Sequence, residues 1–500
     1  MLLFPQGLDF IDAWFGCLLA GVLPAPAPMP QAHRLARLLP RLRGMIEDAR
    51  PAAVLTTPEG LAFSAEVGGP PWLALQAEDD DVDCPIEDPA PDAPAQLQYT
   101  SGSTSQPKGT VLTHRNILAN SRSIQQAWGF DRQSHSVVWV PHFHDDGLIQ
   151  GILQPLFTGF PCTLLPAVDF VARPVRWLRA ISDHRATHSG GPNFAYELCT
   201  RKVTDEERRG LDLSSWRLAY NAAEPVRVDT LDAFTQAFSP SGFSPGALTP
   251  SFGLAEATLL VTGRPRPAGP RRLDVDARAF EREGAVRTVQ SGAAGARSWV
   301  SCGPPAPGVT VHIVDPITGE PLPEGRLGEI GVSGEAVAAG YLDKPEESAR
   351  TFGLHAEGVD RPLLRTGDQG FLHQGELYVT GRLKELIILR GENHYPQDIE
   401  ATAAACPPAL LPGGVAAGGG GAGCGGGGLT TPEGAGGGPL PGACCESEPR
   451  KPPVLPQLNP SPESEAELGV GRPPARAAPV ESLCWIGPGA GDSVMIRSST

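Results

Sequence analysis

A run of small and hydroxyl-bearing residues that ends in a lone lysine constrains this chain most. Leu97 and Tyr99 lead into the run, which closes at Lys108 and Gly109. Glycine permits close backbone approach to an anion, hydroxyls can donate to its oxygens, and an ammonium supplies a point charge. The order predicts a strand that enters a polyphosphate-holding loop, whose small residues include Ser101, Gly102, Ser103 and Thr104.

Two alternatives to this interpretation can be weighed from the residues themselves. The P-loop of nucleoside triphosphatases needs a lysine directly after its second glycine, whereas Lys108 precedes Gly109 here. A flexible Ser/Gly linker is the other alternative, but Pro107 and the immediate return of Val111 and Leu112 favour a structured loop.

Composition indicates a soluble globular protein of two or three domains, because 41% of the 500 residues are hydrophobic. A net charge of -16 argues against nucleic acid as a partner. Ten cysteines occur without any C-x-x-C pair, as expected of a reduced cytoplasmic chain. The apolar run from Phe10 to Leu23 follows Asp9, contains Asp12 and lacks a basic start, so it predicts a core helix and no signal peptide or transmembrane segment.

Apolar periodicity predicts an α/β fold followed by antiparallel strands. The expected helices are Leu8–Leu23, Arg37–Ala49 and one beginning at Thr113–Asn116; the expected strands are Ala53–Leu55, Leu73–Leu75, Val137–Val140, Val309–Val314 and Gly328–Val332. The last two strands, bounded by glycine or proline, indicate a small β-barrel.

Two further motifs contain candidate ligands. His142, His144, Asp145 and Asp146 form a cluster that could bind a metal, although a bare H-x-H without a distant third ligand is a weak signature. Glu256 is the single carboxylate of an otherwise uncharged turn and is a candidate Mg²⁺ ligand, because Mg²⁺ needs few protein carboxylates when phosphates supply the rest. A solvated glutamate at a helix N-terminus is the alternative.

Six motifs in order, over about residues 3 to 405, resemble the adenylate-forming superfamily and within it the fatty acyl-AMP ligase branch. They are the loop before Lys108, the His144 turn, 218–225, 251–258, 365–371 and 379–389. The resemblance implies two doubly wound α/β subdomains and a small β-barrel. The chain start resembles an internal part of the family's first subdomain, so we expect several tens of family residues upstream.

The resemblance also implies roles for individual residues. Lys108, Glu256 and His144 would be catalytic, with His144 orienting the carboxylate substrate, Thr104 and Glu256 binding Mg²⁺, and Lys384 acting as the hinge of a lid. ATP would be bound by Thr100, Ser101, Gly102, Ser103, Thr104 and Lys108, by Asn221, Ala222, Ala223 and Glu224 at the adenine, by Phe252 and Gly253, and by Asp368 and Arg382 at the ribose and α-phosphate.

The implied reaction is the ATP-dependent conversion of a fatty acid to acyl-adenylate and pyrophosphate. The acyl group would then pass to the phosphopantetheine thiol of an acyl carrier protein or polyketide synthase module. An acyl-CoA synthetase and a catalytically impaired nucleotide-binding protein are the alternatives.

The predicted domains are an adenylation core over 1–382, with a family-type insertion at about 264–300 and the barrel region at 301–382, then the hinge and start of a lid over 383–405. Residues 406–500 are expected to be a disordered tail, because fifteen of the thirty residues from 411 to 440 are glycine. The lid lysine of the family has no counterpart there, since Lys451 lacks its motif.

Overall fold

The computed structural model describes residues 1–75, 88–99, 107–264, 269–389 and 392–395, and four short strands beyond them. The chain divides into two compact units. The first contains Met1–Lys384, Arg390–Asn393 and Val480–Thr500, and the second contains Glu385–Leu389 and His394–Pro479. All residues of the candidate site described below belong to the first unit.

The N-terminal part is a parallel sheet of β1 (Leu2–Leu3), β2 (Val54–Thr56) and β3 (Trp72–Ala74) with two helices, α1 (Leu8–Leu19) and α2 (Leu35–Ala49). The predicted strands and the second helix are confirmed. The first helix ends at Leu19 and not at Leu23, because the backbone turns at Gly21, whose φ of 66° lies in the left-handed region.

Next comes the antiparallel pair of β4 (Pro94–Tyr99) and β5 (Gly109–Thr113), in which Tyr99 lies opposite Gly109. The short strand β16 (Gly340–Tyr341) joins the other edge of β5. Helix α4 (His114–Trp128) then begins as predicted. The Thr113 side chain accepts a hydrogen bond from the Asn116 backbone N–H and the Asn116 side chain accepts one from the Thr113 N–H.

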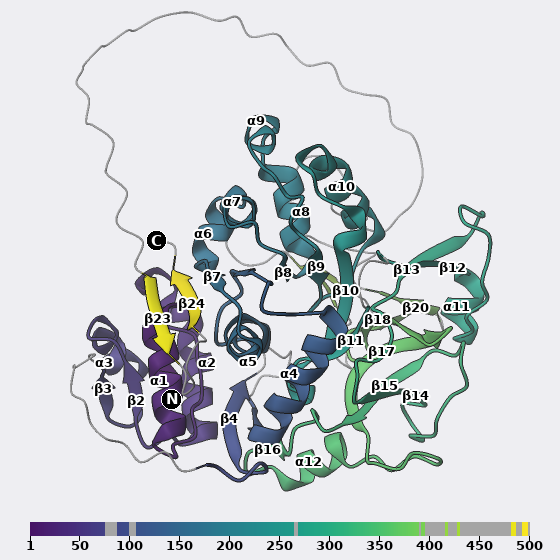
Figure 1. Ribbon diagram of the computed structural model, residues 1–500. Coiled ribbons are helices and arrows are strands. Elements are labelled where there is room, and N and C mark those ends of the chain that lie inside the picture. The colour runs from purple at the N-terminus through teal and green to yellow at the C-terminus, as the bar shows by residue number, and fades with distance from the viewer. Residues whose placement is uncertain are drawn as a thin grey trace, which may run out of the picture. The chain divides into compact units, whose positions relative to one another are not determined.

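The largest sheet has the order β11-β10-β9-β8-β6-β7-β24-β23 (Figure 1). The strands from β10 through β7 are parallel and β11 is antiparallel to β10. Their bounds are β6 (Ser136–Val138), β7 (Cys162–Leu164), β8 (His188–Gly191), β9 (Leu218–Asn221), β10 (Leu248–Gly253) and β11 (Leu260–Gly263). The carboxyl ends of β6, β9 and β10 therefore meet at one edge, which is where open α/β sheets bind ligands.

Helices connect these strands. They are α5 (Gln154–Thr158), α6 (Ala167–Ala172), α7 (Val175–Asp183), α8 (Asn193–Lys202), α9 (Asp205–Arg209) and α10 (Val228–Phe238), and a π-helical stretch (Asp146–Leu153) precedes α5. Helices α8 and α10 pack together beside the carboxyl ends of β8 and β9 (Figure 1). Buried aromatic rings of this region, including Trp177, Tyr196, Trp216 and Phe234, form one apolar core.

The predicted insertion contains an antiparallel pair, β12 (Arg272–Asp276) and β13 (Ala296–Val300), with α11 (Ala277–Glu283) between them. The four-stranded antiparallel sheet β14-β15-β17-β18 then follows, with α12 (Pro345–Phe352) before its third strand. Its strands are β14 (Val309–Val314), β15 (Gly328–Gly334), β17 (Leu364–His373) and β18 (Glu376–Arg382). The two strands expected at the barrel are therefore confirmed as an antiparallel pair.

After β18 come β19 (Ile387–Leu389) and β20 (Glu392–His394). In the predicted tail the structure describes two antiparallel pairs. They are β21 (Ala416–Gly418) with β22 (Gly428–Thr430), and β23 (Ser482–Ile486) with β24 (Ser493–Ser498). The rest of the predictions for the lid and the tail falls outside the described residues.

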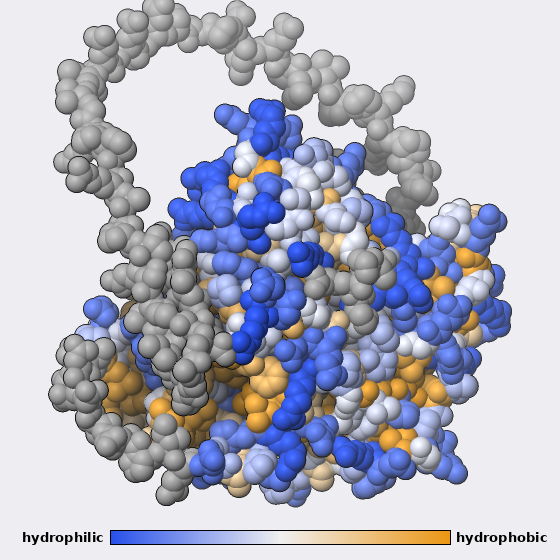
Figure 2. All heavy atoms as spheres, viewed as in Figure 1, coloured by the Kyte–Doolittle hydropathy of each residue, from blue (hydrophilic) through white to orange (hydrophobic). Residues whose placement is uncertain are grey.

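Large apolar side chains that remain exposed, such as Leu73, Val168 and Ile317, come from separate parts of the chain. Polar and apolar residues are interspersed on the face seen in Figure 2. Among the described helices, none combines the length and the apolar character needed to cross a membrane.

Candidate active site

The predicted polyphosphate loop connects β4 to β5. Thr100, Ser101, Gly102, Ser103 and Thr104 lie outside the described residues, so their predicted roles remain predictions. Lys108, at the end of the loop, is described, and its side chain is 24% exposed. Its ammonium forms an ion pair with Glu347 of α12 and lies 5.5 Å from the ring centre of Tyr341. The structure thus places the predicted lysine in a partly buried charged cluster.

Glu256 belongs to the same cluster. It lies in a single helical turn, Ala255–Ala257, just after the carboxyl end of β10. The Tyr341 hydroxyl donates a hydrogen bond to its Oε1 over 3.0 Å. Burial, and then the negative charge of Glu256, raises the pKa of Tyr341 far above its ordinary value, so the phenol keeps the proton it donates. Tyr341 therefore lies between Lys108 and Glu256, the two residues that the sequence predicts to contact Mg²⁺-bound phosphates.

Tyr341 and Glu347 were not predicted from the sequence. They lie in the segment Gly340 to Glu347, which ends β16 and begins α12. The sequence shows a proline at the start of α12 and two glutamates in its first turn. Such a pattern is usually explained by the helix dipole alone and does not indicate a site.

The His-Asp turn follows the carboxyl end of β6. Gln98, the residue before Tyr99, donates a hydrogen bond to the Phe143 carbonyl over 2.8 Å, which ties the turn to the entrance of the phosphate loop. Burial, and then the positive charge of Arg41, lowers the pKa of His144 to about 4. His144 is therefore a neutral imidazole at pH 7 and can accept or donate a hydrogen bond without carrying charge.

The neighbouring His142 has a different environment. Its ring is 3% exposed and stacks on Phe10 with ring centres 3.8 Å apart. Burial, followed by the proximity of His144, lowers its pKa to about 3. Neither ring nitrogen has a hydrogen-bond partner among the described residues. His142 thus contributes to packing beneath the turn, and only His144 is partly accessible.

The two aspartates of the turn titrate near neutral pH. Burial raises the pKa of Asp145 to about 6, with a further increase from the nearby charge of Glu256. Burial and the adjacent Asp145 raise the pKa of Asp146 to about 7, although the Tyr220 hydroxyl donates to its Oδ2 over 3.2 Å. The charge of Glu256 therefore acts on the carboxyl of Asp145 in this turn.

Asp146→Asn should stabilise the protein at pH 8 more than at pH 5. A carboxyl whose pKa is higher in the folded state stabilises the fold while protonated, and this contribution is lost as pH rises from the ordinary value of 3.8 through about 7. Asparagine is never charged and retains an acceptor for Tyr220. Partial exposure of Asp146 reduces the effect, so we expect about 1–2 kcal/mol at pH 8. Thermal unfolding at both pH values measures it, and a pH-independent difference would contradict the assignment.

The predicted adenine loop follows the carboxyl end of β9. Asn221 is fully buried, and its amide donates to Asn193 Oδ1 over 3.3 Å while its own Oδ1 has no partner among the described residues. Ala222 is partly exposed and Ala223 exposed, with φ of 69°. The Glu224 carboxylate accepts a hydrogen bond from the Phe194 backbone N–H over 2.5 Å. Asn221 thus faces the interior, and its contact with adenine stays a prediction.

Phe252 and Gly253 close β10. Phe252 is 8% exposed and packs with Val261, Val311 and Val332, which leaves little free ring face. The predicted contact of Phe252 with ATP stays a prediction. At Gly253, a Cβ would lie 1.9 Å from the Leu259 carbonyl oxygen, so no larger residue fits this close approach.

Asp368 and Arg382 face each other on β17 and β18. Arg382 Nε lies 3.4 Å from Asp368 Oδ1; the arginine side chain is 50% exposed and the aspartate 13%. The structure thus brings together the two residues predicted at the ribose and α-phosphate. Lys384, two residues beyond β18, is exposed.

The described residues contain no group of three or more His, Cys, Asp or Glu side chains placed to hold a metal ion. Glu256 can offer one carboxylate, and the other predicted ligand, Thr104, lies outside the described residues. This donor set suits Mg²⁺ that is held mainly by phosphate oxygens.

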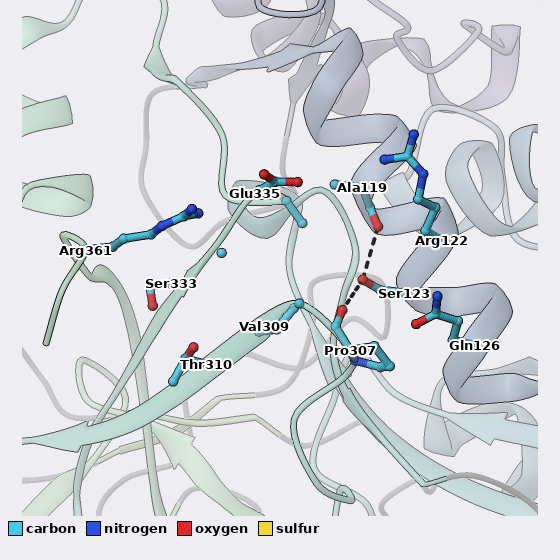
Figure 3. A pocket seen from close by; sticks show the side chains of 13 residues that line it. Ala119, Arg122, Ser123, Gln126, Pro307, Val309, Thr310, Ser333, Glu335 and Arg361 are labelled. Carbon is cyan, nitrogen blue, oxygen red and sulfur yellow. Dashed lines mark hydrogen bonds between the residues drawn. The ribbon is translucent and has the colours of Figure 1, made fainter.

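A cavity of about 570 Å³ lies between α4 and the β14–β15 pair and contains none of the predicted site residues (Figure 3). Arg122 and Arg361 approach it from opposite sides, and Ser123 donates to the Pro307 carbonyl. We place the site at the Lys108–Glu256 cluster instead, because that cluster lies at the carboxyl edge of the parallel sheet.

Comparison with known proteins agrees with this fold. The AMP-binding enzyme family matches residues 1–342. The chain belongs to that family and, within it, to the fatty acyl-AMP ligase branch. It is 46% identical over 416 residues to the medium-chain-fatty-acid–[acyl-carrier-protein] ligase JamA of Moorena producens, covering 80% of this chain and 70% of that protein. It is 39% identical over 422 residues to a long-chain-fatty-acid–AMP ligase of Mycobacterium marinum, covering 80% and 71%.

Solved structures give the same result. The fatty acid AMP ligase from Legionella pneumophila matches with a TM-score of 0.73 and 38% identity, covering 83% of this chain and 73% of that one. A fatty acyl-adenylate ligase from the same organism, in complex with acyl adenylate and pyrophosphate, matches with a TM-score of 0.72, the same identity and the same coverage.

Proposed function

We propose that this chain activates a fatty acid with ATP, forming acyl-adenylate and pyrophosphate. The observation that carries the proposal is the cluster in which Tyr341 lies between Lys108 and Glu256 at the carboxyl edge of the sheet. Relatives named as a fatty-acid–[acyl-carrier-protein] ligase and a fatty-acid–AMP ligase support it, as does a related structure in complex with acyl adenylate and pyrophosphate.

The chain's own residues would act by position and charge. Lys108 would exchange its ion pair with Glu347 for one with the triphosphate. Thr104 and Glu256 would hold Mg²⁺, which when bound neutralises phosphate charge. Attack of a carboxylate on the α-phosphorus needs alignment and charge neutralisation more than covalent help.

The remaining predicted residues would fix the nucleoside and admit the acid. Asp368 and Arg382, already paired, would bind the ribose and α-phosphate, and Asn221 to Glu224 would border the adenine. The neutral imidazole of His144 would donate a hydrogen bond to the entering carboxylate without adding a positive charge. A cytoplasmic location would suit this chemistry.

The acceptor distinguishes this function from that of an acyl-CoA synthetase. We propose the phosphopantetheine thiol of an acyl carrier protein or polyketide synthase module as the acceptor. The name of the Moorena producens relative, an acyl-carrier-protein ligase, supports the carrier protein. AMP release with a fatty acid and ATP should therefore accelerate on addition of holo-acyl carrier protein and stay unchanged with CoA. Acceleration by CoA alone would identify an acyl-CoA synthetase, and the apo-carrier is the matched control.

A further inference from the structure

Asp48, on helix α2, contacts both ends of the phosphate loop. Its Oδ2 accepts a hydrogen bond from the Tyr99 hydroxyl over 2.9 Å and another from the Gly109 backbone N–H, also over 2.9 Å. Tyr99 is the last residue of β4 and Gly109 the first of β5. Asp48 Oδ2 therefore links the end of β4 to the start of β5, the two strands that flank the phosphate loop.

The other oxygen of Asp48 forms an ion pair with Lys344. Lys344 lies between Tyr341, which contacts Glu256, and Glu347, which contacts Lys108. A single segment, 341–347, thus touches Glu256, Asp48 and Lys108 at successive steps of three residues. Asp48 connects that segment with the loop ends on the other side.

Helix α2 is shaped for close contact with the loop. Gly44, one turn before Asp48, faces Pro107, and a Cβ on Gly44 would lie 2.9 Å from the Pro107 Cδ. Arg41, on the same helical face, lies close enough to His144 to lower its pKa. The spacing of Arg41, Gly44 and Asp48 places all three on one side of the helix, towards the site.

The Asp48 side chain is only 5% exposed. A buried carboxylate is stable only when donors satisfy it, and here two neutral donors and one ammonium do so. If an uncharged residue replaces Asp48, a donor at the loop ends lies opposite an amide or an apolar group and no longer opposite a carboxylate. The loop ends are then no longer fixed relative to the segment that carries Glu347.

We propose that Asp48 is a positioning residue for ATP: it sets the separation and orientation of the phosphate-loop ends, and thereby the place of Lys108. The inference rests on the proposed function, because it names the residue through which the fold aligns that nucleotide site. Asp48 itself does not touch the reacting groups.

The test compares the 500-residue wild-type chain with Asp48→Asn and with the control Asp92→Asn. The Asp92 side chain pairs with Arg115 at the surface and is 75% exposed. Calorimetry gives the affinities for ATP–Mg²⁺ and for a long-chain fatty acid, and hydrogen exchange reports the Gly109 amide. For Asp48→Asn we expect about tenfold weaker ATP binding, faster Gly109 exchange and unchanged fatty-acid affinity. Asp92→Asn should change none of these.

Other results would overturn the proposal in separate ways. Unchanged ATP affinity with faster Gly109 exchange would show that the loop ends need not be fixed. Equal losses of affinity for ATP and for the fatty acid would show that Asp48 has only a general structural role. Should Asp48→Asn fail to fold, Tyr99→Phe removes one donor and keeps the ring; it should weaken ATP binding several-fold, and an unchanged affinity would overturn the proposal. Absence of ATP binding by wild type would instead refute the proposed function.

Discussion

Lys108→Ala should weaken ATP–Mg²⁺ binding by about tenfold to a hundredfold, the range expected when a charge-assisted hydrogen bond to phosphate is lost. Lys108 is one of five lysines in the chain. Among the described residues, its ammonium has one carboxylate partner, Glu347. Glu256→Gln removes the carboxylate proposed for Mg²⁺ and should produce a loss of similar size in the presence of Mg²⁺ only.

Glu347→Gln is the matched control for Lys108. It removes the partner of the lysine but leaves the phosphate-binding charge, so ATP affinity should stay within about fivefold of wild type, the scale of a partly exposed ion pair. Calorimetry with and without Mg²⁺ separates these cases. Equal affinities for wild type, Lys108→Ala and Glu256→Gln would show that the cluster does not bind the triphosphate.

Replacing the residues after Ala405 with the lid of a related ligase should speed pyrophosphate release by at least about a hundredfold. Residues 406–500 carry one lysine, Lys451, within Pro-Arg-Lys-Pro-Pro, and no counterpart of the family's lid motif. Removal of one preorganised group that stabilises developing charge typically lowers a rate by about 10²–10³, and closure that excludes water would add to that.

The measurement is pyrophosphate release with ATP and a long-chain fatty acid for the natural chain and the hybrid. ATP affinity should be similar in the two proteins, because the binding residues belong to the shared part. The matched control is a hybrid whose lid lysine is changed to alanine, which should lose most of the gain. Equal and rapid release by the natural chain and the hybrid would show that residues 1–405 position and neutralise both anions without a lid.

Local patterns in the sequence predicted the residues whose role depends on their own motif. Lys108 and Glu256 were each the only charge of their kind in an uncharged stretch, and the structure joins them through Tyr341. The roles of Asp368 and Arg382 are implied by the resemblance to the adenylate-forming superfamily, and the two residues lie opposite each other because β17 and β18 pair in that register. The segment from Thr113 to Asn116 predicts the start of α4, which is confirmed.

Contacts between distant segments could not be predicted in this way. Asp48 is an ordinary helical acid in sequence, and its role depends on a fold that brings α2 against Tyr99 and Gly109. The contact of Asn221 with adenine stays a prediction, and the hydrogen bond that its amide donates to Asn193 of α8 is one that the sequence does not indicate. The chemistry of one side chain does not indicate which of several possible hydrogen-bond partners will lie beside it in the folded protein.

The most direct test of the central claim uses a fatty acid labelled with ¹⁸O in its carboxylate. Attack by this carboxylate on the α-phosphorus places one labelled oxygen in the acyl-adenylate bridge, and that oxygen stays with AMP when a thiol or water attacks the acyl carbon. We expect AMP that carries one ¹⁸O atom, detected by mass spectrometry, with this chain and with the lid hybrid. AMP without the label, formed at the same rate whether or not fatty acid is present, would contradict it.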